Sequence, residues 1–147
     1  MPTPVTPFVG CDVFVTDESS RVLLVRRQDD GLWALPGGCQ DLGETVAECA
    51  CRECREETGF VVSLVGLLGV FSSRRYERIH SPWKKNEYCH LLFQATIVGG
   101  VGTPSTETSE VAFFAEQDLP ALSDGHAVRI SWGFRVLRES ALPPFFE

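Results

Sequence analysis

The stretch GCQDLGETVAECACRECREETGF, Gly38–Phe60, decides the fold of this 147-residue chain. It continues the segment LPGG, residues 35–38, in which one proline and two glycines exclude a helix. Thr45 then begins an expected helix, because Glu48 lies three residues further on and completes a capping-box pattern. Gly59 is expected to end that helix at the C′ position. The sequence therefore predicts a glycine-rich loop that leads directly into a helix.

The expected helix carries an acidic face formed by Glu53, Glu56 and Glu57. On a helix these three side chains fall within about 100° of arc, where like charges destabilise by about 0.2–0.5 kcal/mol per pair. They also lie near the C-terminal end, where the helix dipole disfavours anions. Arg52 offsets part of this cost through Glu56, and a cation held between the carboxylates would offset far more. Hard oxygen ligands suit Mg²⁺ or Mn²⁺, although the cluster alone also fits an exposed acidic face with an ordinary salt bridge.

Apolar segments on both sides of this helix have the patterns of strands. Residues 8–16 alternate, so that Val9, Cys11, Val13 and Val15 share one face. We predict strands at residues 8–16, 21–27, 61–71, 88–98 and 110–114, loops at residues 72–86 and 99–109, and a last helix at residues 125–140. Strands before and after a central helix, plus a C-terminal helix, predict an α/β (α+β) fold with a mixed sheet covered on both faces.

The composition indicates one globular domain over residues 1–147, with residues 1–7 as a loose lead-in. Apolar residues make up 44% of the chain, and the net charge is −7. An acidic surface disfavours binding to nucleic acid, but a divalent cation would still allow a phosphorylated ligand to bind. We see no apolar run long enough to span a membrane and no signal peptide. A cytoplasmic protein without a nucleic-acid or membrane partner is expected.

The six cysteines are expected to stay reduced in the cytosol. Cys49, Cys51 and Cys54 lie on the predicted helix, but they do not form a paired C-x-x-C knuckle. We interpret them as small apolar residues of a helix face. A structural zinc module is the alternative hypothesis.

The fixed positions of residues 38–60 resemble the Nudix box, G-x5-E-x7-R-E-U-x-E-E-x-G-U, in which U is a bulky aliphatic residue. Every fixed glycine, glutamate and arginine matches. Cys54 and Phe60 depart from the usual residues at two U positions, which affects packing rather than charge. The flanking strands and the C-terminal helix also resemble the Nudix αβα sandwich with its central mixed β-sheet, so the resemblance covers most of the chain.

The resemblance implies a Mg²⁺-dependent pyrophosphohydrolase, with Mn²⁺ as a possible substitute. Nudix enzymes hydrolyse the pyrophosphate bond of a nucleoside diphosphate linked to another group X, so the expected partner is a small nucleotide. Candidate substrates are ADP-ribose, NDP-sugars and CDP-alcohols, and the alternative enzyme is a pyrophosphohydrolase of dNTPs or oxidised dNTPs. A non-catalytic nucleotide sensor is the hypothesis from another class, although such sensors often lose box glutamates that this chain keeps. Many family members are homodimers, which is a further expectation here.

By the same resemblance, Glu53 and Glu57 are the first candidates for metal ligands, and Glu56 is the next. The backbone carbonyl of Gly37 or Gly38 is a candidate for a further ligand. The expected metal site therefore consists of the three glutamates and Gly38, and Gly37 and Gly38 are also candidates for substrate binding.

Arg52 is expected to hold one of these glutamates in place, and Glu44 to stabilise the junction between loop and helix. The family varies in its general base, which is either a box glutamate or one on a later loop. Here that loop offers Glu107 and Glu110, and we prefer Glu110, which lies just before a strand.

Arg26 and Arg27 end a strand close in sequence to the glycine loop, which makes them candidates for phosphate binding. Strand alternation sends them to opposite faces, so at most one readily reaches a phosphate. Weaker candidates are five aromatic residues that could stack on a base and five basic residues of one loop: Trp33, Phe71, Tyr76, Trp83 and Tyr88, and Arg74, Arg75, Arg78, Lys84 and Lys85. The histidines His80, His90 and His126 are too scattered in sequence to nominate as a set.

Overall fold

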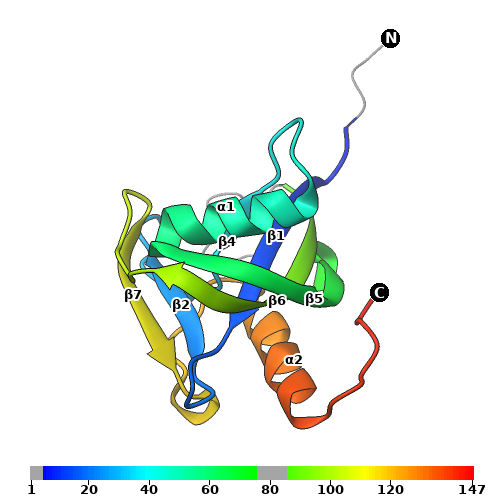
Figure 1. The fold of residues 1–147 in the computed structure, drawn as a ribbon. Coiled ribbons are helices and arrows are strands. Elements are labelled where there is room, and N and C mark those ends of the chain that lie inside the picture. Colours follow the sequence, from blue (N-terminus) through cyan, green and yellow to red (C-terminus); the bar gives the residue numbers. More distant parts are fainter. Residues whose placement is uncertain (1–4, 76–85) are drawn as a thin grey trace.

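The computed structural model describes residues 5–75 and 86–147. Two helices, α1 (Val46–Thr58) and α2 (His126–Arg138), lie on opposite sides of a four-stranded sheet (Figure 1). The strand order of that sheet is β4-β1-β6-β5, and the bounds are Phe8–Val15 for β1, Gly37–Cys39 for β4, Phe60–Ser72 for β5 and Tyr88–Gly100 for β6. Strand β1 is parallel to β6, whereas β1 pairs with β4, and β5 with β6, in antiparallel fashion. The predicted mixed sheet and αβα layering are confirmed.

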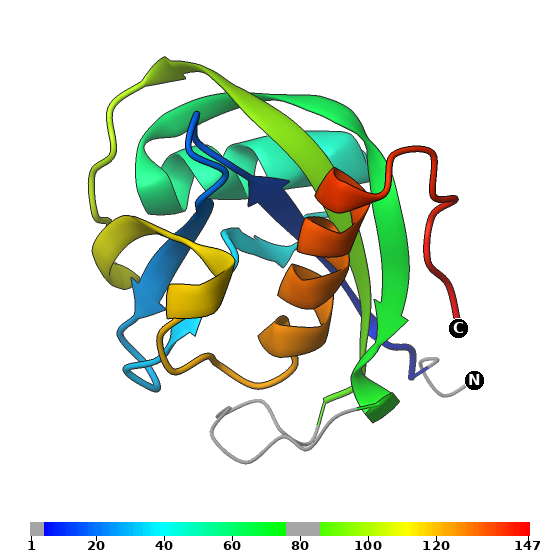
Figure 2. The same cartoon turned by 90° about the horizontal axis from the view of Figure 1, so that it is seen from below.

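A second, three-stranded sheet extends the layer beside the first. Its order is β3-β2-β7, with bounds Trp33–Ala34 for β3, Val22–Arg27 for β2 and Thr108–Phe114 for β7, and both pairings are antiparallel. Seen from the side of α2, the ribbon shows α2 in front of β1 and α1 behind it (Figure 2).

Alternation along β1 supplies both halves of the core. Cys11, Val13 and Val15 are fully buried in the cluster under α1, as their predicted common face requires. Phe14 points the other way, into the cluster that contains Ile130 of α2. Since β1 lies in the middle of its sheet, both of its faces are covered. Asp12 lies on the α2 face of this strand, where it is buried.

The ends of α1 form as the sequence predicts. Thr45 is the N-cap, and its side chain accepts a hydrogen bond from the Glu48 N–H at 3.1 Å while the Glu48 carboxylate accepts one from the Thr45 N–H. Gly59 is the C-cap with φ 77°, and its N–H donates to the Arg55 carbonyl. These capping hydrogen bonds therefore satisfy a backbone group at each end of α1.

Four strands differ from the prediction by their existence or by two residues at one end. Strands β3 and β4 lie where the sequence indicates turns and loop, because strands of two or three residues form only by pairing with β2 and β1. Strand β7 begins at Thr108, two residues before the predicted start, and β6 runs to Gly100 instead of ending at residue 98. As a result, Glu110 lies inside β7 and Glu107 directly precedes it.

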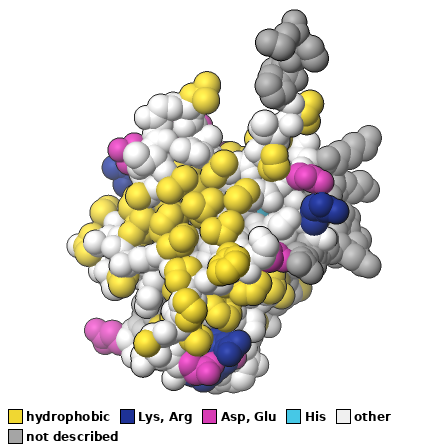
Figure 3. All heavy atoms as spheres, turned by 90° about the vertical axis from the view of Figure 1, so that its right-hand side faces the viewer, with side chains coloured by type: hydrophobic (Ala, Val, Ile, Leu, Met, Phe, Trp, Pro, Cys, Tyr) yellow, Lys and Arg dark blue, Asp and Glu magenta, His cyan; other side chains and the backbone are white. Residues whose placement is uncertain are grey.

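Apolar side chains gather on the face that β5 lines (Figure 3). The exposed ones on β5 are Val61, Val65 and Leu67, which are 42%, 62% and 38% exposed. In residues 5–75 and 86–147, neither helix has the length and apolar character needed to cross a membrane.

Candidate active site

A cavity of about 660 Å³ opens beside the C-terminal half of α1. Its walls come from β1, β2, β4, α1, the start of β6, the segment that leads into β7, and the first turn of α2. The glycine-rich loop, the acidic helix and the later acidic loop of the sequence thus meet at one place.

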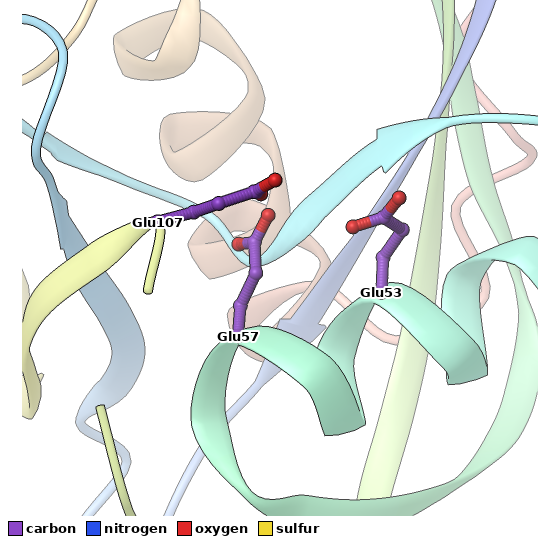
Figure 4. Close-up of side chains that lie close together, drawn as sticks. All are labelled: Glu53, Glu57 and Glu107. Atoms are coloured by element: carbon purple, nitrogen blue, oxygen red, sulfur yellow. The ribbon is translucent and has the colours of Figure 1, made fainter. Parts of the chain in front are cut away.

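Three carboxylates that line this cavity converge: Glu53, Glu57 and Glu107 (Figure 4). Glu53 and Glu57 extend from successive turns of α1, and Glu107 reaches them from the segment before β7. One oxygen atom of each lies within 4.8 Å of the others. Burial, and then the charge of Glu53, raise the pKa of Glu57 well above its usual value, and burial also raises the pKa of Glu53. Three crowded carboxylates are a suitable oxygen set for Mg²⁺ or Mn²⁺.

The absence of side chains at Gly37 and Gly38 of β4 allows this crowding. A Cβ at Gly38 would lie 2.5 Å from the Glu53 carboxylate, and one at Gly37 would lie 2.2 Å from Asp12 Oδ1. The Gly37 N–H donates a long hydrogen bond of 3.4 Å to Glu57 Oε2. The Gly38 carbonyl, a predicted metal ligand, accepts a hydrogen bond from the Cys49 thiol. Glycine is needed here for close approach.

Arg52 holds the acidic side of α1 in a network of ion pairs. Its Nη1 lies 2.9 Å from Glu53 Oε1 and 3.1 Å from Glu56 Oε2, and its Nη2 lies 2.8 Å from Glu44 Oε1. The hydrogen bond from Arg52 lowers the pKa of Glu44 to about 2. Glu44 also accepts a hydrogen bond from the N–H of Asp41 in the loop before the helix. Glu56 lies on the outer side of the network with its side chain 55% exposed, apart from the three converging carboxylates.

The two arginines at the end of β2 point in different directions, as alternation predicts. Arg27 lines the cavity and donates to Asp29 at 2.8 Å. Arg26 forms an ion pair of 2.9 Å with Glu110 and does not line the cavity. Glu110, the preferred candidate for the base, is therefore engaged elsewhere, whereas Glu107 lies among the metal-site carboxylates.

A buried polar group deeper in the cavity was not identified from the sequence. Asp12 of β1 is 5% exposed, and its Oδ2 lies 3.0 Å from Nε of Arg129, which is 1% exposed on α2. His126 accepts the Leu35 N–H through Nδ1. Asp12, the charged residue of an otherwise apolar strand, was a signal, as was the spacing of three between His126 and Arg129. His90 lines the same cavity, so histidines distant in sequence meet in space.

The weaker candidates separate by position. Trp33 and Phe71 belong to the core and pack against Phe114 and Phe145, whereas Tyr88 lines the cavity. Arg74 is exposed. The side chain of Arg75 is not described, and the remaining predictions fall on residues outside the described ranges: Tyr76, Arg78, His80, Trp83, Lys84 and Lys85.

The cysteines of α1 fit the apolar interpretation. Cys49 and Cys54 are fully buried in the core under α1, together with Cys11. Burial raises the pKa of the Cys11 and Cys54 thiols to about 11. Within the described part of the chain, no cysteine belongs to a group suited to metal binding.

Comparisons with known proteins point to the same family as the site. The NUDIX domain family matches residues 6–132. YjhB of Bacillus subtilis is 34% identical over 122 residues, which are 83% of this chain and 55% of that protein. An ADP-ribose pyrophosphatase of Methanocaldococcus jannaschii is 32% identical over 123 residues, 82% of this chain and 69% of that protein. The solved structure of a UDP-X diphosphatase has a TM-score of 0.85 at 26% identity, covering 99% of this chain and 70% of that one. The present chain thus spans little more than half the length of YjhB.

Proposed function

The chain belongs to the Nudix family, and from this premise we propose that it hydrolyses the pyrophosphate bond of a nucleoside diphosphate linked to a second group X. The observation that carries the proposal is the convergence of Glu53, Glu57 and Glu107 within 4.8 Å in the wall of a cavity of about 660 Å³. A cavity of this size is in the range that holds a small-molecule ligand.

The carboxylates fit a hard divalent cation, and Mg²⁺ is the proposed cofactor, with Mn²⁺ as a substitute. Such an ion, when bound, neutralises the diphosphate and lowers the pKa of an attacking water. Glu53 and Glu57 are the proposed ligands, together with the Gly38 carbonyl. Arg52 holds Glu53 in position through its bond of 2.9 Å.

The remaining roles belong to side chains outside α1, at the end of β2 and just before β7. Arg27 is the proposed phosphate contact, because it lines the cavity and carries a fixed positive charge. Glu107 is the proposed general base, since it approaches the metal-site carboxylates while Glu110 is paired with Arg26. A base at this position would take its proton from water beside the bound ion.

Substrates of the NDP-X class are favoured by the two relatives named for such compounds. One is named an ADP-ribose pyrophosphatase and the other a UDP-X diphosphatase. The test is a panel of NDP-X compounds and dNTPs with Mg²⁺, following release of nucleoside monophosphate or pyrophosphate. Turnover of dNTPs alone would support the triphosphate alternative. Tight binding without turnover of any compound would support a nucleotide sensor.

Glu107→Gln and Glu110→Gln form a matched pair that tests the base. Both changes remove one negative charge from the same segment of chain. If Glu107 is the base, kcat falls by about 10²–10⁴-fold in Glu107→Gln only. A loss confined to Glu110→Gln would return the role to that residue.

Two further expectations remain proposals: the protein acts in the cytoplasm, and it forms a homodimer. Light scattering on the purified protein measures the second. A monomeric mass at micromolar concentration would contradict it.

A further inference from the structure

The guanidinium of Arg129 has a hydrogen-bond donor left over inside the cavity. Its Nε lies 3.0 Å from Asp12 Oδ2, and its Nη2 lies 3.3 Å from Nδ1 of His126. Its Nη1 is buried and has no hydrogen-bond partner among the described residues. Both contacted residues line the cavity, so the guanidinium faces it. A buried unpaired donor is costly, and a ligand acceptor would satisfy it.

Burial and contacts with two other residues hold the Arg129 guanidinium in place. Arg129 is fully buried on α2, and its contact with Asp12 ties α2 to the middle strand of the sheet. His126 is held by the N–H of Leu35 at 3.1 Å, so its Nδ1 acts as an acceptor and the ring is neutral. A donor held this rigidly can select a ligand by hydrogen-bond pattern.

A flat aromatic wall lines the same cavity. The rings of Tyr88 and His90 stack at 5.4 Å with an angle of 13° between their planes, and Phe8 lies 5.7 Å from Tyr88. All three residues line the cavity. Gly10 leaves room for the imidazole, because a Cβ there would lie 2.9 Å from His90 Nδ1. An aromatic wall beside a polar group suits a planar ring with polar edges.

We propose that Arg129 and Asp12 select a nucleobase that presents a carbonyl oxygen next to a ring N–H, which is the edge of uracil or guanine. The Arg129 Nη1–H donates to the carbonyl, and the Asp12 carboxylate accepts the ring N–H. Cytosine and adenine present an amino group in place of the carbonyl, so a donor would face a donor. The inference rests on the proposed function, and it names the nucleotide class that the site takes.

The sharpest probes are UMP and CMP, which differ only in this edge of the base. Isothermal titration with Mg²⁺ present should show UMP binding about tenfold more tightly than CMP or better, since a mismatch leaves buried polar groups unpaired. Arg129→Lys keeps the positive charge for Asp12 but removes the spare Nη1 donor, and it should bring the two affinities to within about twofold. Arg135→Lys is the matched control, because Arg135 lies on the same helix in an exposed ion pair with Glu139. It should keep the preference for UMP.

A second variant covers the case in which Arg129→Lys fails to fold. Asp12→Asn combined with Arg129→Gln replaces the buried ion pair by a neutral pair, and thermal unfolding by circular dichroism checks that it folds. It too should lose the preference. Equal affinity of the wild-type protein for UMP and CMP, no detectable binding of either, or an unchanged preference in the folded variant would overturn the inference.

Hydrolysis separates this inference from the proposed function. UDP-glucose, GDP-glucose, CDP-glucose and ADP-glucose share one group X and differ only in the base. Turnover of all four at similar kcat/KM overturns the selection by Arg129 and leaves the proposed function standing. Discrimination between UMP and CMP without turnover of any sugar nucleotide supports the selection and counts against the proposed reaction.

Discussion

At the scale of single residues, the site depends on two glycines, Gly37 and Gly38, as much as on its acidic side chains. Gly38→Ala should lower kcat by about tenfold or more and weaken the dependence on Mg²⁺, because its Cβ would lie 2.5 Å from the Glu53 carboxylate and displace it. Gly66→Ala is the control, since a Cβ there meets nothing within 4 Å. Kinetics over a Mg²⁺ titration measure both variants. An unchanged Mg²⁺ optimum in Gly38→Ala would remove the link between β4 and the metal site.

The metal site itself gives the second prediction at this scale. Glu57→Gln should lower kcat by orders of magnitude while the protein still folds, because it removes a charge that only the bound cation needs. Without metal, the same change should raise the melting temperature, since a buried carboxylate beside Glu53 is unfavourable when ionised. Activity assays and thermal unfolding in EDTA test the two halves. Full activity in Glu57→Gln would contradict the ligand assignment.

Residue spacing predicts which side chains meet when they are close in sequence, but not when they are far apart in it. Glu53 and Glu57 are four residues apart on one helix, so their common face follows from helical geometry. Asp12 and Arg129 are separated by almost the whole chain, and only the packing of α2 on β1 brings them together. The choice between Glu107 and Glu110 depended on where β7 begins, and boundaries of strands are poorly encoded in local sequence.

At the scale of elements, the sequence specifies α1 well, because its capping residues and its apolar and acidic faces all indicate the same helix. Gly59 and Gly43 both have positive φ, 77° and 87°, but only Gly59 lacks room. A Cβ at Gly59 would lie 2.3 Å from the Val101 carbonyl, whereas one at Gly43 meets nothing within 4 Å. Gly43→Ala should therefore cost about 1–2 kcal/mol for its backbone conformation alone, and Gly59→Ala should cost clearly more. Urea unfolding of the pair measures the difference. Equal losses of unfolding free energy in the two variants would show that the backbone near Val101 shifts without cost to make room for the Cβ.

Elements without their own pattern could not be predicted in this way. Two of the three residues of strand β4 are glycines, which are depleted in strands, and the strand exists because Asp12 and Cys11 of β1 pair with it. The longer strands and both helices, by contrast, carry alternation or helical periodicity of their own. Their existence was therefore predictable, and their ends less so.

At the scale of the whole molecule, the buried histidines tie stability to pH. Burial and the charge of Arg129 lower the pKa of His90 to about 2, against about 6.5 in the unfolded chain. The unfolded state thus binds the proton more readily, so this stabilisation is complete above about pH 6.5 and is lost on acidification at about 1.4 kcal/mol per pH unit. The groups around the imidazole include Asp12 at 3.9 Å, Arg129, His126 and the stacked ring of Tyr88.

His90→Gln isolates this contribution. Its free energy of unfolding should fall less steeply than that of the wild type between about pH 6.5 and pH 4.5, by about 1.4 kcal/mol per pH unit. The comparison cancels His126, which acts in the same direction, and Glu53 and Glu57, whose raised pKa values act in the opposite one. Urea unfolding in EDTA across this range is the measurement. Parallel curves would exclude His90 as a source.

The central place of β1 also has a consequence for biosynthesis. Strand β1 is synthesised well before β6, yet its parallel ladder pairs Phe8 with Tyr88 and continues to Val15 with Ala95. In the nascent chain β1 can therefore pair early with β4, but its parallel neighbour β6 is made much later, and α2 closes over β1 later still. Until then, the edge of β1 that pairs with β6 and the face that α2 covers stay exposed, and this is the interval in which a chaperone would have most to protect.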